Sequence, residues 1–160
     1  MRIFAALVFS IIWSGSAAAQ WYYQGEESAF GAGGTHIALA ANGRYGFGIR
    51  CQNGDLNFVF ITPEEISTDQ ATVLSSSQLK LLLRVDDMPA NTLAGVADSS
   101  DGKLRVTAVA SADEVGQIRD AKKRLAVAAS IGTEVFHEIK FTSRGSTKVI
   151  EKVLSGCGVR

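Results

Sequence analysis

Few residues of this 160-residue chain have the types and spacing that catalysis requires. Its two histidines, His36 and His137, have no neighbours at the spacing of metal ligands. The adjacent acids at 26–27, 64–65 and 86–87 would point to opposite faces of a strand, unlike the paired carboxylates of a glycosidase. No serine stands in a Gly-x-Ser-x-Gly elbow. We therefore expect a protein that is not an enzyme and that carries neither a metal nor another cofactor.

The composition places these residues in one folded domain. Charged residues make up 20% of the chain, and 16 basic residues balance 16 acidic ones. This balance argues against a disordered tail and against a nucleic-acid-binding protein with a basic surface. We assign residues 35–160 to a single globular domain and residues 20–34 to a flexible lead-in. The aromatic residues at 21–23 should pack on the domain or extend an edge strand.

The first 19 residues have the order of a secretory signal peptide. Arg2 gives a positive start, residues 3–13 are apolar, and small residues lead to Ala19. The apolar stretch is about half of the roughly 20 residues that a membrane span needs. We predict cleavage between Ala19 and Gln20, a periplasmic location, and no stable membrane insertion of the mature protein.

Cys51 and Cys157 are the two cysteines of the chain. An isolated pair in an oxidising compartment most often forms a structural disulfide. The alternative is a redox-active pair, but the two residues lack the Cys-x-x-Cys spacing. We predict a disulfide between Cys51 and Cys157 that ties a C-terminal helix to an early strand.

Most of the domain should be β-strand. Apolar segments at 35–41, 44–51 and 55–62 are separated by Asn42-Gly43 and Asn53-Gly54, which predict tight hairpins with positive φ at both turn residues. Period-two alternation predicts strands at 79–86, 103–108 and 134–141, the last with His137 on the apolar face of Val135, Ile139 and Phe141. His36 should be exposed at the start of a strand. Residues 98–102 should form a turn.

Two helices should interrupt the strands. Ser111 and Glu114 have the spacing of a capping box, and apolar residues follow at helical steps as far as Leu125. A second helix should span 146–156. Residues 62–65 should start a further helical turn, the serines at 75–77 should form a loop, and 124–130 fit either helix or strand. The predicted class is α+β, an antiparallel β-rich sheet or sandwich with two helices.

Arg44 and Tyr45, just after the first Asn-Gly turn, are candidate partner-binding residues. Arginine and tyrosine are favoured interface anchors, and a tight hairpin would project them together. The alternative is a solvated arginine beside an ordinary strand tyrosine. Gly46 and Gly48 leave one face of the same strand bare, which suits either close packing of another element or a flat surface for a partner.

The residues Ala-Asn-Gly-Arg-Tyr at 41–45 resemble the Ser-Gly-x-x-Tyr loop of periplasmic and membrane-bound lysozyme inhibitors. Tyr45 matches that loop and Arg44 takes its variable place, while Ala41 and Asn42 replace the serine and the glycine. The resemblance implies a loop that enters the lysozyme cleft and engages its catalytic carboxylates. Because lysozyme is cationic, an inhibitor should gain from an acidic patch, which Asp86, Asp87 and residues 98–101 would provide if the fold brings them together.

The end of the chain carries a second resemblance. Phe141, the Gly-Ser-Thr at 145–147, Val153 and Cys157 are similar to the closing strand, helix and cysteine of several periplasmic families, some accompanying secretion systems and others resembling invasion-associated proteins. We therefore expect a non-enzymatic periplasmic binding protein. An inhibitor of host c-type lysozyme that protects the cell wall is the first hypothesis, and an envelope, secretion-system or invasion-associated accessory protein is the alternative.

Overall fold

The computed structural model describes residues 20–27 and 34–159. The predicted signal peptide and the glycine-rich segment 28–33 of the lead-in lie outside the described residues. The elements, in chain order, are β1 (Trp21–Glu27), β2 (Gly34–Asn42), β3 (Tyr45–Gln52), β4 (Asp55–Glu65), α1 (Thr68–Ser76), β5 (Leu79–Val85), β6 (Asn91–Ala94), β7 (Val96–Ser100), β8 (Lys103–Val109), α2 (Ala112–Asp120), β9 (Arg124–Ile131), β10 (Glu134–Thr142) and α3 (Ser146–Cys157).

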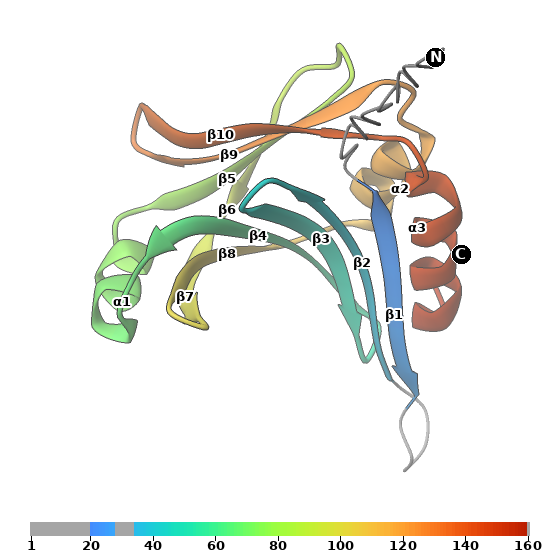
Figure 1. Ribbon diagram of the computed structural model, residues 1–160, viewed down its shortest axis with the longest axis horizontal. Helices are drawn as coiled ribbons and strands as arrows, with labels where there is room; N and C mark the ends of the chain where they lie inside the picture. Colours follow the sequence, from blue (N-terminus) through green and yellow to red (C-terminus); the bar gives the residue numbers. More distant parts are fainter. Residues whose placement is uncertain (1–19, 28–33, 160) are drawn as a thin grey trace, which may run out of the picture.

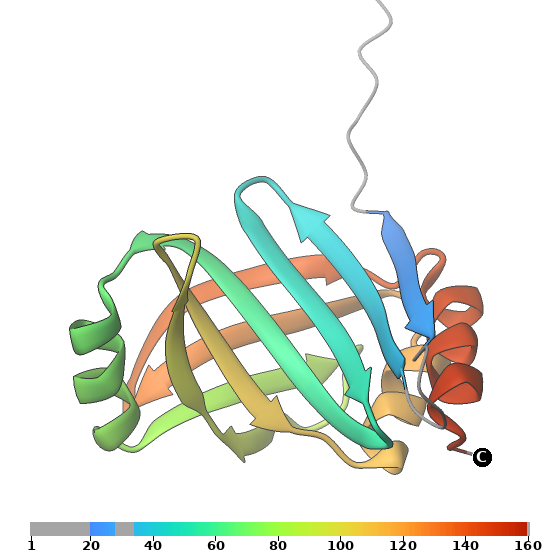
Figure 2. The ribbon, with the colours of Figure 1, turned by 90° about the horizontal axis from the view of Figure 1, so that it is seen from below.

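Two antiparallel sheets lie face to face and enclose the core (Figure 1). The first has six strands in the order β1-β2-β3-β4-β8-β7, and the second has four in the order β10-β9-β5-β6. Helix α1 lies at one end of the sandwich, and α2 and α3 lie together at the other (Figure 2). The predicted α+β class is confirmed, with three helices in the described residues instead of two. None of these helices is long and apolar enough to cross a membrane.

Aromatic side chains join the two sheets through the core. Phe47 of β3 is fully buried, and its ring centroid lies 5.8 Å from that of Phe58 and 6.0 Å from that of Phe141 in the other sheet. Trp21 packs edge-on against Phe47, and its indole nitrogen donates to the carbonyl oxygen of Thr142 at 2.9 Å. Residues 21–27 of the predicted lead-in therefore form an edge strand, as the aromatic residues led us to expect.

The predicted disulfide is confirmed. Cys51 of β3 bonds to Cys157, the last residue of α3, across a sequence separation of 106. Helix α3 packs on β1, β2 and β3, and its Ile150 and Val153 are fully buried. The chain leaves the helix at Gly158, whose φ of 71° is in the left-handed region that glycine adopts without strain. The disulfide thus fixes the C-terminal helix to the six-stranded sheet.

The expectation that His36 is exposed was wrong. His36 is only 7% exposed, lies opposite Cys51 in the strand pairing, and has its Nδ1 atom 2.9 Å from the hydroxyl oxygen of Tyr23. Helix α3, which is more than 100 residues away in the chain, covers it. Gly156 makes this packing possible, because a Cβ atom there would lie 2.5 Å from the His36 ring.

Three predicted boundaries near the helices were also wrong. Strand β4 continues through Glu65, so 62–65 is not a helical turn, and the serines at 75–77 form the end and cap of α1 instead of a loop. That helix begins after Ser67, whose capping box with Gln70 we had not identified. Helix α2 has the predicted Ser111–Glu114 box but ends at Asp120. Residues 124–130, left open above, belong to strand β9.

Two helical glycines give a matched test of this packing. Gly156→Ala should lower the free energy of unfolding by about 1–3 kcal/mol, because the methyl group would overlap the buried His36 ring. Gly116→Ala in α2 should raise it by about 0.5–1 kcal/mol, because no atom lies within 4 Å of its added Cβ and alanine favours the helix. Urea denaturation of both variants measures the difference. Equal effects would show that α3 does not press on His36.

Candidate functional site

The first hairpin places Arg44 in the turn itself. Asn42 pairs with Tyr45, so the two loop residues are Gly43 and Arg44, and of these Gly43 has a positive φ of 60°. The prediction of positive φ at both Asn42 and Gly43 was therefore wrong. A two-residue turn whose first loop residue is glycine needs a positive φ at that glycine alone. At the second hairpin Asn53 and Gly54 both have positive φ, as predicted. Because the turn lies one residue further along the chain than predicted, Arg44 is exposed at its tip.

Tyr45, at the start of β3, is held between the two sheets. Its ring stacks on that of Phe60, with centroids 6.0 Å apart and planes inclined by 12°. Its hydroxyl oxygen lies 3.3 Å from Nδ1 of His137 in β10. Beside it, the Nδ2 atom of Asn42 donates to the carbonyl oxygen of Lys140 at 2.8 Å. The hairpin is thus fastened to a strand of the opposite sheet.

His137 lies on a β-bulge. Its φ is 54°, and the pairing of β10 with β9 shifts between Phe136 and Ile139. The extra residue breaks the predicted alternation, and Val135, which we placed on the apolar face, is 53% exposed. Bulges often re-aim a side chain. Here the bulge sets His137 between Tyr45 and Glu64, whose Oε2 atom lies 2.5 Å from the Nε2 atom of His137.

Arg44, Tyr45, Glu64, Glu65 and His137 together form what we call the hairpin end. Its exposed residues are Arg44, Glu64 and Glu65. The Nη2 atom of Arg44 lies 3.4 Å from the carbonyl oxygen of Pro63, and Glu65 pairs with Lys103 at 2.7 Å. The hydrogen bond from Lys103 lowers the pKa of Glu65, and the charge of Arg44 lowers it further. Both ring nitrogens of His137 contact side chains of the domain. This arrangement can position a charged surface.

The candidate acids Asp86 and Asp87 lie elsewhere. They follow β5 and lie beside Arg124 of β9. Arg124 pairs with Thr142 of β10, and Thr142 is five residues from His137, or about 16 Å along that strand. The Asp86 carboxylate accepts hydrogen bonds from the backbone N–H groups of residues 122, 123 and 124 at 2.8–2.9 Å. These bonds lower the pKa of Asp86. Asp87 pairs with Lys123 at 2.7 Å. The structure therefore does not bring these acids to Arg44 and Tyr45.

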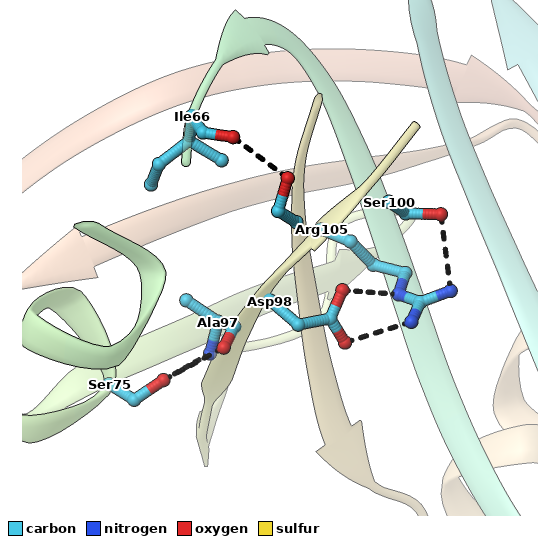
Figure 3. Close-up of polar contacts among 7 residues, drawn as sticks. Ile66, Ser75, Ala97, Asp98, Ser100 and Arg105 are labelled. Atoms are coloured by element: carbon cyan, nitrogen blue, oxygen red, sulfur yellow. Dashed lines mark hydrogen bonds and ion pairs between the residues drawn. The ribbon is translucent and has the colours of Figure 1, made fainter. Parts of the chain in front are cut away.

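The other predicted acids lie at the opposite end of β5. The backbone nitrogen of Gly95, between β6 and β7, donates to the carbonyl oxygen of Leu79, which is the first residue of β5. Asp86, in contrast, follows the last residue of β5. Asp98 of β7 accepts two hydrogen bonds from the guanidinium of Arg105, at 2.7 and 2.9 Å (Figure 3). Residues 98–100 belong to β7, so the predicted turn is confined to Asp101 and Gly102. Residues 98–101 therefore do not converge with Asp86 and Asp87 into one acidic patch.

Sequence reasoning missed the serines that hold the edge strand β7. The hydroxyl oxygen of Ser75 in α1 accepts from the backbone nitrogen of Ala97 at 2.8 Å and donates to its carbonyl oxygen at 2.9 Å (Figure 3). The Ser99 hydroxyl donates to the carbonyl oxygen of Ile66 at 2.7 Å. Such bonds satisfy backbone groups at a sheet edge. Neither serine stands in a motif that signals this role.

Asp86 gives a test by pH. Because its pKa is lowered on folding, the stability it contributes is present above the unfolded pKa, about 3.9, and is lost as pH falls through the lower folded value. Asp86→Asn, which tolerates the φ of 50°, should lower stability at pH 7 and shrink the loss between pH 7 and pH 3. Thermal unfolding across that range measures both. Asp101→Asn, at a turn with φ of 52°, is the control; equal profiles would contradict this role.

No family model matches the chain, and no curated protein matches it. Among solved structures, the crystal structure of invasion associated protein B from Bartonella henselae has a similar fold, with a TM-score of 0.53. The similarity covers 88% of this chain and 95% of that one, at 11% sequence identity. The chain therefore shares its fold with an invasion-associated protein.

Proposed function

We propose that the chain is an exported, non-enzymatic binding protein of the bacterial envelope that contacts a protein partner through the hairpin end. One observation carries the proposal: Arg44 is exposed in a two-residue loop whose neighbour, Tyr45, is fixed by Phe60 and His137. Arginine and tyrosine are frequent interface anchors. A loop that is ordered before binding loses little conformational entropy on binding.

Two features support export and binding over catalysis. Disulfides such as Cys51–Cys157 form and persist in oxidising compartments, which include the bacterial periplasm. The groups best suited to acid–base chemistry are engaged within the domain: His137 between Tyr45 and Glu64, and Asp86 with three backbone N–H groups. These contacts favour a role in holding the surface in shape.

A host c-type lysozyme is our first candidate partner. Glu64 and Glu65, with side chains 52% and 83% exposed, lie at the hairpin end and would face a cationic partner favourably. Arg44 would meet acidic groups in the cleft of the enzyme. Tyr45 would act by positioning Arg44, because its ring is packed against Phe60. The acids at 86–87 and 98–101 are not needed for this contact.

An invasion-associated or secretion-system accessory protein is the second candidate. The fold shared with invasion associated protein B favours it. In this case the hairpin end binds another envelope protein, and lysozyme activity is unaffected.

Lysis of bacterial cell walls by c-type lysozyme, followed by turbidity, separates the two candidates. For an inhibitor, oxidised protein spanning residues 20–160 should reduce lysis in proportion to its concentration. Arg44→Ala should then weaken inhibition by about tenfold or more, the effect of removing an interface anchor. Arg84→Ala, which removes an exposed arginine from β5 in the other sheet, should leave inhibition unchanged.

A folded protein that leaves lysis unchanged at large molar excess would reject the lysozyme hypothesis. Envelope extracts passed over immobilised wild-type protein and Arg44→Ala would then test the accessory role. We expect a partner that the wild-type protein retains and the variant releases. A partner retained equally by both would show that the hairpin end is not the binding surface.

A further inference from the structure

The outer face of the six-stranded sheet has a groove with a volume of about 320 Å³. Strand pairing explains its position. Leu39, Gly48 and Val59 are neighbours across β2, β3 and β4, so the missing side chain of Gly48 leaves a hollow between two aliphatic walls. A Cβ atom on Gly48 would lie 2.7 Å from the carbonyl oxygen of Ala38, so the close approach of β2 requires glycine here. We call this hollow the outer groove.

The groove is apolar at positions where a sheet usually faces solvent. Ile37, Leu39, Val59 and Ile61 line it, and Tyr22, which is 58% exposed, lies at its side. Outward-facing strand residues of an antiparallel sheet are commonly polar. Figure 2 looks onto this face, and no helix of the described residues lies in front of it. The close approach of β2 at Gly48 fits the first interpretation of the bare glycine face, close packing, and the uncovered outer face leaves room for the second, a surface for a partner.

Two arginines line the groove in different states. The guanidinium of Arg105 is neutralised by two hydrogen bonds to Asp98. Arg50, two residues along β3 from Gly48, has its Nε atom buried and, among the described residues, without a hydrogen-bond partner. A buried donor without an acceptor is unfavourable, particularly on a charged group. A ligand in the groove would supply the missing acceptor when the Arg50 side chain turns this N–H toward it.

We propose that the outer groove binds a free medium-chain fatty acid. Its hydrocarbon chain would lie over Gly48 between Leu39 and Val59, and its carboxylate would accept hydrogen bonds from Arg50. A planar carboxylate matches the fork of an arginine. A peptide is disfavoured, because peptides that add to sheets bond to the backbone of an edge strand, whereas β3 is paired on both sides. The volume is at the lower end of the range for small-molecule sites.

Titration with decanoate, decanol and decylammonium below their aggregation concentrations tests this, using protein made from the full chain with its disulfide intact. In ¹⁵N–¹H spectra, decanoate should shift the amides of Leu39, Gly48 and Val59 most. Decanol and decylammonium should bind about tenfold or more weakly, because only decanoate offers the Arg50 guanidinium a charged acceptor. Arg50→Met, which keeps an apolar side chain, should reduce decanoate affinity to that of decanol. Arg84→Met on the other sheet should leave decanoate affinity unchanged.

A second variant guards against misfolding of the first. Gly46→Leu places a side chain beside Leu39 and Ile61, where an added Cβ meets only ordinary contacts at 3.7 Å. This variant should block decanoate binding while its circular dichroism spectrum stays unchanged.

Equal affinity for the three compounds, shifts centred elsewhere, or undiminished binding by Arg50→Met would overturn the proposal. Self-association that Arg50→Met abolishes, without decanoate binding, would assign the groove to a second copy. Arg44→Ala tests the hairpin end separately and should not alter decanoate binding.

Discussion

The bond between Cys51 and Cys157 fixes the element that closes one end of the sandwich. Because the two cysteines are 106 residues apart, the chain-entropy model assigns the bond about 4–5 kcal/mol through its restriction of the unfolded chain. The bond also sets the place of α3, and with it the burial of His36 under Gly156. Helix α3 is held by Cys157 and by the buried residues Ile150 and Val153 at the end of the sandwich. It does not extend over the outer face of the six-stranded sheet (Figure 2).

At the rim of the sandwich the two sheets are joined by polar contacts. The bulge at His137 turns one ring toward both Tyr45 of β3 and Glu64 of β4, and the Asn42 side chain adds a bond to β10. Stacking on Phe60 fixes the plane of the Tyr45 ring at the edge of the apolar core. The position of Arg44 in solvent therefore follows from packing inside the domain, which is the physical basis for regarding the hairpin end as preorganised.

The sequence predicted what depends on neighbouring residues. Alternation and the Asn-Gly turns placed β2, β3, β4, β5, β8 and β10, the Ser111–Glu114 spacing placed a helix start, and the isolated cysteines predicted their disulfide. It could not predict what distant elements decide: α3 buries His36, the bulge displaces His137 from its expected face, and α1 uses Ser75 to hold β7. Arg44 and Tyr45 were found as neighbours, but their contacts with Pro63 and His137 depend on strand pairing and on the opposite sheet.

Strand β3 links the two proposed surfaces through its period of two. Phe47, Ile49 and Cys51 face inward and are fully buried, and they hold the sheets and α3 together. The alternate positions, Gly46 and Gly48, carry no side chain and are followed by Arg50. Because the inward residues fix the strand, its outer side can remain bare without loss of core packing. One strand thus carries Tyr45, next to Arg44 of the hairpin end, at its start and Arg50 of the outer groove near its other end, so that a substitution in one proposed surface leaves the other intact.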